Sequence, residues 1–227
     1  MKKLIISILL LINVYANEFE IKSINANSGV IECDNLKIGQ SGVVVRNLGD
    51  FNSIIKNATL IKIEDTKCIV NFSEFNSLTQ IALPSLKENP KVGDKIIFNS
   101  LYNKGLVIAP NAKTYSKIIN KYSDKSWIHP DIFATYLESE NNPAPTKESF
   151  NKFCNAYSIG LVYFILDREY IVDCNSFKVI DIKNIELEDN ENEIKPFYSR
   201  LGELTANFFS FKDEIKNYKE YYKNLLK

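Results

Sequence analysis

The chain has 227 residues, with 28 basic and 28 acidic side chains, so its formal net charge at pH 7 is zero. Nucleic-acid-binding proteins usually carry a clustered basic excess, and this balance argues against a nucleic-acid partner. The length is sufficient for one or two domains with a sizeable core, and we expect two.

The first 16 residues have the pattern of a secretory signal peptide. Lys2 and Lys3 form a positive start, an apolar run covers Leu4–Ile12, and small residues lead up to Ala16. A membrane-spanning helix needs about 20 apolar residues, which is more than this run supplies. We therefore predict cleavage after Ala16 and export to the periplasm or the outer cell surface. Cleavage removes two of the 28 basic side chains and none of the 28 acidic ones, leaving a formal charge of −2.

Residues 17–110, the first part of the mature chain, contain short β-branched runs separated by turns rich in Gly, Asn and Asp. The candidate strands are residues 19–24, 29–33, 42–46, 59–63, 68–72, 95–98 and 105–108. Short strands at this spacing are typical of a small antiparallel barrel or sandwich. We predict that this domain ends near Pro110.

Residues 111–185 show a different pattern, which predicts an α+β domain. Apolar residues fall at helical spacing between Tyr115 and Tyr122, and a second helix is expected to begin near Thr146. Three strands are expected after it, at residues 159–166, 170–174 and 177–182. The first two of these strands are predicted to form a hairpin.

The last part of the chain is predicted to be an acidic linker over residues 186–196, followed by one long amphipathic helix over residues 197–227. The apolar seam of this helix comprises Leu201, Leu204, Phe208, Phe211, Ile215, Tyr218, Tyr222 and Leu225. Aromatic residues occupy half of this seam, which is unfavourable for a two-stranded coiled coil. We therefore favour docking of the helix on the chain's own second domain, with a homodimer through this helix as the alternative.

Four cysteines are divided equally between the two halves, with Cys33 and Cys68 in the first and Cys154 and Cys174 in the second. Export would place them in an oxidising compartment, where disulfides persist. Pairing within each half is the simplest of the three connectivities. Four buried free thiols are the alternative. No CxxC pair is present, so we expect no metal site.

The sequence contains a single histidine, His129, within the segment Trp127–Asp131. A hydrolase would have to use it as the base, but no GxSxG motif accompanies it. Glycine-rich phosphate-binding motifs are absent from the sequence as well. We interpret His129 as a structural residue, and we expect a protein without a cofactor and without enzymatic activity.

Three segments of the chain resemble segments of a known protein family: residues 38–46 (IGQSGVVVR), 92–95 (VGDK) and 127–131 (WIHPD). Together they resemble the N-terminal domain of the plasminogen-binding protein PgbA family, exported proteins of host-associated Gram-negative bacteria. The resemblance implies capture of host plasminogen at the cell surface. It also implies that a C-terminal lysine is recognised by the kringle domains of plasminogen.

Lys227 is the last residue of the sequence, and Lys223 lies one helical turn before it. A terminal lysine offers an ammonium group and an α-carboxylate at a fixed separation, and capture of a chain terminus is an established recognition mode. We therefore predict that Lys227, with Lys223, binds the partner. The alternative role for both is to offset the helix dipole, worth about 0.3 to 1 kcal/mol each. The alternative function is a periplasmic structural or assembly module that contacts other envelope proteins.

Overall fold

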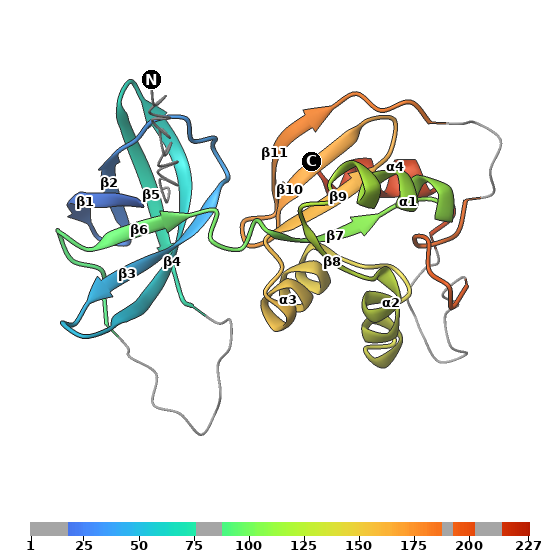
Figure 1. Ribbon diagram of the computed structural model, residues 1–227, viewed down its shortest axis with the longest axis horizontal. Coiled ribbons are helices and arrows are strands. Elements are labelled where there is room, and N and C mark those ends of the chain that lie inside the picture. Colours follow the sequence, from blue (N-terminus) through green and yellow to red (C-terminus); the bar gives the residue numbers. More distant parts are fainter. Residues whose placement is uncertain (1–17, 76–87, 188–192, 203–214) are drawn as a thin grey trace, which may run out of the picture.

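The computed structural model describes residues 18–75, 88–187, 193–202 and 215–227, which form two domains (Figure 1). The first domain is a closed antiparallel barrel of six strands. The second is a five-stranded sheet with helices packed on both faces. The predicted class is confirmed: an α+β protein with an N-terminal barrel and a C-terminal helix.

The barrel strands follow one another around the barrel in the order β1-β2-β5-β4-β3-β6. Their bounds are β1 Glu18–Asn25, β2 Ser28–Glu32, β3 Ser41–Asn47, β4 Asn52–Glu64, β5 Lys67–Ser73 and β6 Lys95–Phe98. Strand β6 closes the barrel, because it pairs with β1 on one side and with β3 on the other. No strand of the barrel is therefore left with a free edge.

The barrel is filled by alternate residues of each strand. In β5, Cys68, Val70 and Phe72 are buried, while Lys67 and Asn71 are exposed. This alternation is the two-residue period of a strand with one dry face. A disulfide joins Cys68 to Cys33, just after β2, with 5.8 Å between the two Cα atoms.

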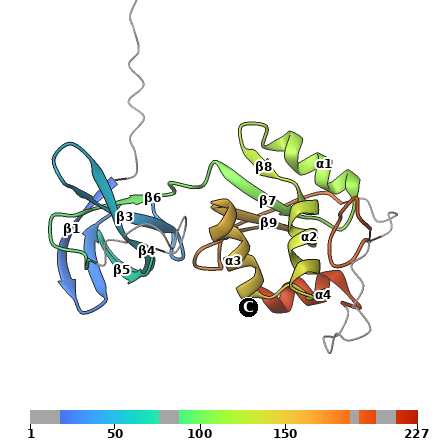
Figure 2. The same ribbon diagram turned by 90° about the horizontal axis from the view of Figure 1, so that it is seen from below.

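The sheet of the second domain has the strand order β11-β10-β9-β7-β8. Its elements are β7 Lys104–Ile108, α1 Ala112–Lys121, β8 Ser126–Ile128, α2 Pro130–Ser139, α3 Lys147–Tyr157, β9 Leu161–Ile165, β10 Glu169–Asp173, β11 Lys178–Lys183 and α4 Tyr218–Leu225. Strand β7 runs parallel to β8 and β9, whereas β9, β10 and β11 are antiparallel. Helix α1 covers one face of the sheet, and α2, α3 and α4 cover the other (Figure 2).

Strand β7 corrects the predicted domain boundary. Residues 105–108 were assigned to the barrel, but β7 is an inner strand of the second sheet, between β8 and β9. Leu106 packs on one face of this sheet and Val107 on the other, so the run is buried on both sides. A short apolar run of this kind does not reveal its sheet by periodicity. The chain therefore passes between the domains after Phe98 and not near Pro110.

Two elements were missed by the sequence analysis, and one was predicted differently. Strand β8 and helix α2 lie on either side of His129, where no element was expected. Of the helix predicted over residues 197–227, the structure shows α4 at Tyr218–Leu225, whereas residues 197–202 form bends and turns. Residues 203–214 of the predicted helix, and 188–192 of the predicted linker, lie outside the described residues.

Candidate functional site

Helix α4 begins at a well-formed N-terminus and has one buried face. The Asn217 side chain accepts a hydrogen bond from the Glu220 N–H at 2.9 Å, which satisfies one of the free donors of the first turn. Tyr218 and Tyr222, four residues apart, are fully buried on the same face. An isolated helix of eight residues is marginal in water, so α4 depends on this packing.

Three tyrosine hydroxyl groups hold α4 on the second domain. The Tyr218 hydroxyl donates to the carbonyl oxygen of Ile108 at 2.8 Å, at the end of β7. The Tyr222 hydroxyl donates to the Pro196 carbonyl at 2.9 Å, and the Tyr221 hydroxyl to a carbonyl before α3, also at 2.9 Å. Burial raises the pKa of Tyr218 and Tyr222, so both hydroxyls stay protonated and keep donating. The helix is therefore fixed in position as well as in rotation.

Three lysines, Lys219 and Lys223 of α4 and Lys227 just after it, form a row that we call the lysine stripe. They are spaced four residues apart; Lys219 and Lys223 follow one another along one side of α4, and Lys227 comes directly after the C-cap residue, Leu226. Both residues predicted to bind the partner, Lys223 and Lys227, belong to this stripe. The buried tyrosines fix the helix from which Lys219 and Lys223 project.

The ammonium groups of the lysine stripe have only weak partners. Lys223 Nζ lies 3.2 Å from an Asp167 carboxylate oxygen, and Lys219 Nζ lies 4.0 Å from a Glu193 oxygen. Lys227 Nζ donates to the Asn224 side-chain oxygen at 2.9 Å. Solvent-exposed ion pairs contribute little, about 0 to 1 kcal/mol. A partner's carboxylate could therefore displace these contacts at small cost.

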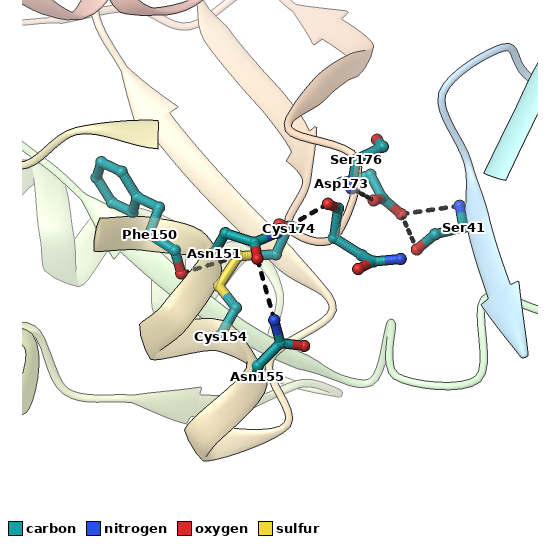
Figure 3. Close-up of a disulfide and its surroundings, with 9 residues drawn as sticks. Ser41, Phe150, Asn151, Cys154, Asn155, Asp173, Cys174 and Ser176 are labelled. Atoms are coloured by element: carbon teal, nitrogen blue, oxygen red, sulfur yellow. Dashed lines mark hydrogen bonds between the residues drawn. A yellow bond between two sulfur atoms is a disulfide. The ribbon is translucent and has the colours of Figure 1, made fainter. Parts of the chain in front are cut away.

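The second disulfide lies away from the lysine stripe, near the junction of the two domains. It joins Cys154 of α3 to Cys174, just after β10, with 6.2 Å between the Cα atoms. Both pairs in the structure are those within one half of the chain that the sequence analysis favoured. Figure 3 shows that the Cys174 end of this disulfide adjoins Asp173, whose carboxylate reaches Ser41 of the barrel.

Asp173 is the central residue of the domain junction and was not found from the sequence. Its side chain is fully buried, and one carboxylate oxygen accepts from the Ser41 N–H, the Ser41 hydroxyl and the Tyr102 hydroxyl at 2.6 to 2.9 Å. The other oxygen accepts from the Ser176 N–H at 2.8 Å. Ser176 in turn donates to the Gly39 carbonyl of the barrel. The available signal was a charged residue within the apolar run 170–174.

His129 acts as the N-cap of α2, in agreement with its interpretation as a structural residue. Its Nδ1 accepts a hydrogen bond from the Asp131 N–H at 3.2 Å, and Pro130 occupies the first helical position. Burial lowers the pKa of His129 and outweighs the opposing effect of Asp131. The nearby Ser199 hydroxyl donates to Asp131 and not to His129. This geometry differs from a Ser-His-Asp triad, in which the histidine links the other two residues.

Two further features to consider are metal-binding clusters and membrane-spanning helices. No cluster of three or more His, Cys, Asp or Glu side chains suited to a metal ion occurs in the part of the chain that the structure describes. Within the same described ranges, no helix reaches the length and apolar character that crossing a membrane requires.

Comparison with known proteins identifies one matching family and two similar proteins. A family model described as "Plasminogen-binding protein pgbA N-terminal" matches residues 17–226. The chain is 30% identical to plasminogen-binding protein PgbA of Helicobacter pylori strain J99 and 29% identical to that of strain 26695, each over 197 residues. Each match covers 85% of this chain and 43% of the relative. The chain thus spans less than half the length of these relatives.

Proposed function

Because the chain belongs to the PgbA N-terminal family of plasminogen-binding proteins, we propose that it is an exported protein that binds plasminogen through the lysine stripe of α4. The lysine stripe is the observation that carries this proposal. Lys219 and Lys223 belong to a short helix that three tyrosine hydroxyls hold in place, and Lys227 follows directly after its C-cap.

Export is supported by three independent features. Residues 1–16 have the pattern of a signal peptide, and the family match begins at residue 17, directly after the expected cleavage site. The structure pairs all four cysteines, and disulfides persist outside the cytoplasm. Exposure to a host protein additionally requires that the chain reach the outer surface of the cell. Protease treatment of intact cells, followed by detection of α4, tests that step directly.

Lys227 has the central role in the proposed contact, and Lys223 a supporting one. A lysine at a chain end carries an ammonium group and an α-carboxylate, the two charges that a kringle pocket for terminal lysine must match. Rigid attachment of α4 reduces the entropy that is lost when the lysine binds. Lys223, four residues earlier in the last turn of α4, adds a positive charge that attracts an acidic pocket.

The binding experiment compares three proteins on immobilised plasminogen: residues 17–227, the same chain without Lys227, and a chain extended by a few glycines beyond Lys227. The proposal expects binding that free lysine competes away, and a loss of about tenfold or more in affinity for both altered chains, equivalent to about 1.4 kcal/mol. The matched control is Lys62→Ala, which removes an exposed lysine from the barrel and leaves binding unchanged. Equal binding by all three chains would refute a role for the terminal lysine.

A second candidate function is an assembly module that contacts other envelope proteins. It is favoured by the β3–β4 hairpin of the barrel, where Leu48, Phe51 and Ile54 are exposed, Phe51 to 63%. Exposed apolar side chains that lie close together often mark protein contacts. Photo-crosslinking from position 51 in intact cells tests this candidate. A specific crosslinked envelope partner, together with absent plasminogen binding, would favour it over the first proposal.

A further inference from the structure

A groove of about 380 Å³ lies where the second domain meets the barrel. Its floor includes Leu161, Tyr163 and Ile171, which belong to the sheet face that α1 also covers. One wall is formed by residues that follow α1 and another by β11, and Lys37 and Gln40 of the barrel also line it. Small-molecule sites commonly have volumes of about 300 to 1,000 Å³. The groove is separate from the lysine stripe of α4.

Tyr163 presents a hydroxyl group with an unused hydrogen bond in this groove. The residue is 1% exposed, and its ring packs against Trp127 and Tyr122 at centroid distances of 5.1 and 5.2 Å. Its hydroxyl has no hydrogen-bond partner among the residues that the structure describes. Among the described residues, the buried unpaired side-chain atoms are Asn99 Oδ1 and Asn142 Oδ1 and do not include the Tyr163 hydroxyl, so this hydroxyl is open to the groove and can donate to a ligand there. Burial and nearby acidic groups raise the pKa of Tyr163, which keeps the hydroxyl protonated.

Gln40 contributes a second unused donor from the opposite domain. The residue is 9% exposed, and its side-chain oxygen accepts from the Lys37 N–H at 2.7 Å. Its side-chain NH2 group has no partner within the described ranges. The groove therefore offers one donor from each domain, and both donor atoms are open to solvent although the two residues are largely buried. An acceptor-bearing ligand would satisfy both at once.

Three lysines that line the groove can also donate to an acceptor. Lys37 and Lys183 lie 3.0 and 3.9 Å from the same carboxylate, Asp181, and Lys125 donates to the Tyr102 carbonyl at 2.9 Å. Each ammonium group has three protons, so these lysines retain free donors. Three lysines against two aspartates, Asp124 and Asp181, leave the lining with a net charge of +1.

We propose that this groove binds an extended acidic peptide segment. Its carboxylate would lie among the three lysines, and its backbone carbonyl groups would accept from Tyr163 and Gln40. An apolar residue next to the carboxylate would cover Leu161 and Ile171 on the floor. The apolar floor and the separation of the donors over two domains favour a peptide over a small inorganic anion.

The chain contains its own reporter for this site, because Trp127 is the sole tryptophan and packs against Tyr163. The experiment titrates residues 17–227 with the capped tripeptide Leu-Glu-Leu and follows Trp127 fluorescence. We expect a saturable change with Leu-Glu-Leu, binding at least several-fold weaker with Leu-Gln-Leu, and none with Leu-Lys-Leu. Acetate at the same concentrations should give no saturable change.

Variants of the groove test the assignment residue by residue. Tyr163→Phe removes only the hydroxyl and should weaken binding roughly 2- to 12-fold, the effect of one net hydrogen bond. Gln40→Ala should weaken it similarly, and Asp124→Asn should tighten it, because a negative charge is removed. The matched control Tyr136→Phe removes a hydroxyl from the opposite side of the sheet and should leave the affinity unchanged.

The proposal is overturned by any of three results. These are no saturable change with Leu-Glu-Leu at millimolar concentration, equal binding of the lysine peptide or of acetate, or unchanged affinity in both Tyr163→Phe and Gln40→Ala. The fluorescence spectrum of each free variant verifies that the second domain is folded. Deletion of Lys227 should leave peptide binding intact, so this test and the plasminogen test succeed or fail separately.

Discussion

The two domains reach stability by different routes. In the barrel, every strand pairs with two neighbours, and the core is filled by alternate residues of nearby strands. The second domain has an open sheet, and its core is completed by helix α4 from the far end of the chain. The Tyr218 hydroxyl reaches Ile108, 110 residues earlier. The barrel is thus largely self-contained, whereas the second domain depends on the segment that carries the lysine stripe.

The largest effect is expected from Tyr222→Ala, which leaves a cavity in the second domain and removes the hydrogen bond to Pro196. Substitution of a buried aromatic residue by alanine typically costs about 3 to 5 kcal/mol. Urea unfolding followed by Trp127 fluorescence reports this loss from the second domain alone. Tyr222→Phe keeps the ring and should cost only about 1 kcal/mol. A loss below 1 kcal/mol for Tyr222→Ala would show that α4 is not part of this core.

Removal of each disulfide in turn compares the two domains directly. The Cys33–Cys68 bond closes a loop of 35 residues and the Cys154–Cys174 bond one of 20. Double alanine variants should each lose about 3 to 4 kcal/mol, with the longer loop costing roughly 0.5 kcal/mol more. Hydrogen exchange measured for each domain assigns the loss. Loss of protection in the barrel from removal of the Cys154–Cys174 bond would contradict the idea of a self-contained barrel.

Asp173→Ala tests whether the junction makes the two domains unfold together. The substitution leaves the Ser41 N–H and the Tyr102 hydroxyl without their acceptor, at a cost of about 1 to 3 kcal/mol. Calorimetry of the variant should then show two unfolding transitions that lie further apart in temperature than in the unaltered chain. Ser41→Ala, which removes one hydroxyl donor from the same contact, should cost about 1 kcal/mol. An unchanged thermogram for Asp173→Ala would exclude this role.

The smallest effect concerns pH, which should distinguish the domains because the only histidine lies in the second one. Burial lowers the pKa of His129 below its usual 6.5, so the unfolded chain binds the proton more readily than the folded one. Stability from this residue is therefore complete above pH 6.5 and decreases as the pH falls through the lowered value. His129→Asn keeps an N-cap acceptor but does not titrate. Urea midpoints at pH 7.5 and 5.0 should differ less in this variant than in the unaltered chain, and an equal difference would contradict the assignment.

Local patterns revealed much of this structure from the sequence alone. The barrel strands were identified because short β-branched runs alternate with turns rich in Gly, Asn and Asp, and α3 because Pro145 precedes and Glu148 follows the start of a helical pattern at Thr146. Helix α2 was missed although Pro130 and Asp131 are typical of a helix start. Strand β7 was assigned to the wrong sheet, since an apolar run buried on both faces carries no periodicity.

The functional features also divide into those that short-range sequence patterns reveal and those that depend on tertiary packing. The spacing of Lys219, Lys223 and Lys227 can be read directly from the sequence, but the hydrogen bonds that anchor α4 join residues far apart in the chain. The contact of Ser41 with Asp173 spans 132 positions, and the groove donors Gln40 and Tyr163 come from different domains. Such pairings depend on how complete elements pack together, which short-range patterns do not encode.

The single passage of the chain from barrel to sheet, after Phe98, has a consequence for the order of folding during synthesis. The barrel has its full set of strands once β6 has emerged, before any strand of the second sheet has done so. The second domain must wait for Tyr218 and Tyr222, which lie far beyond β6 in the sequence. Domains generally fold as units, with N-terminal ones first. The barrel is therefore expected to be complete while its neighbour is still an open intermediate with exposed aromatic residues.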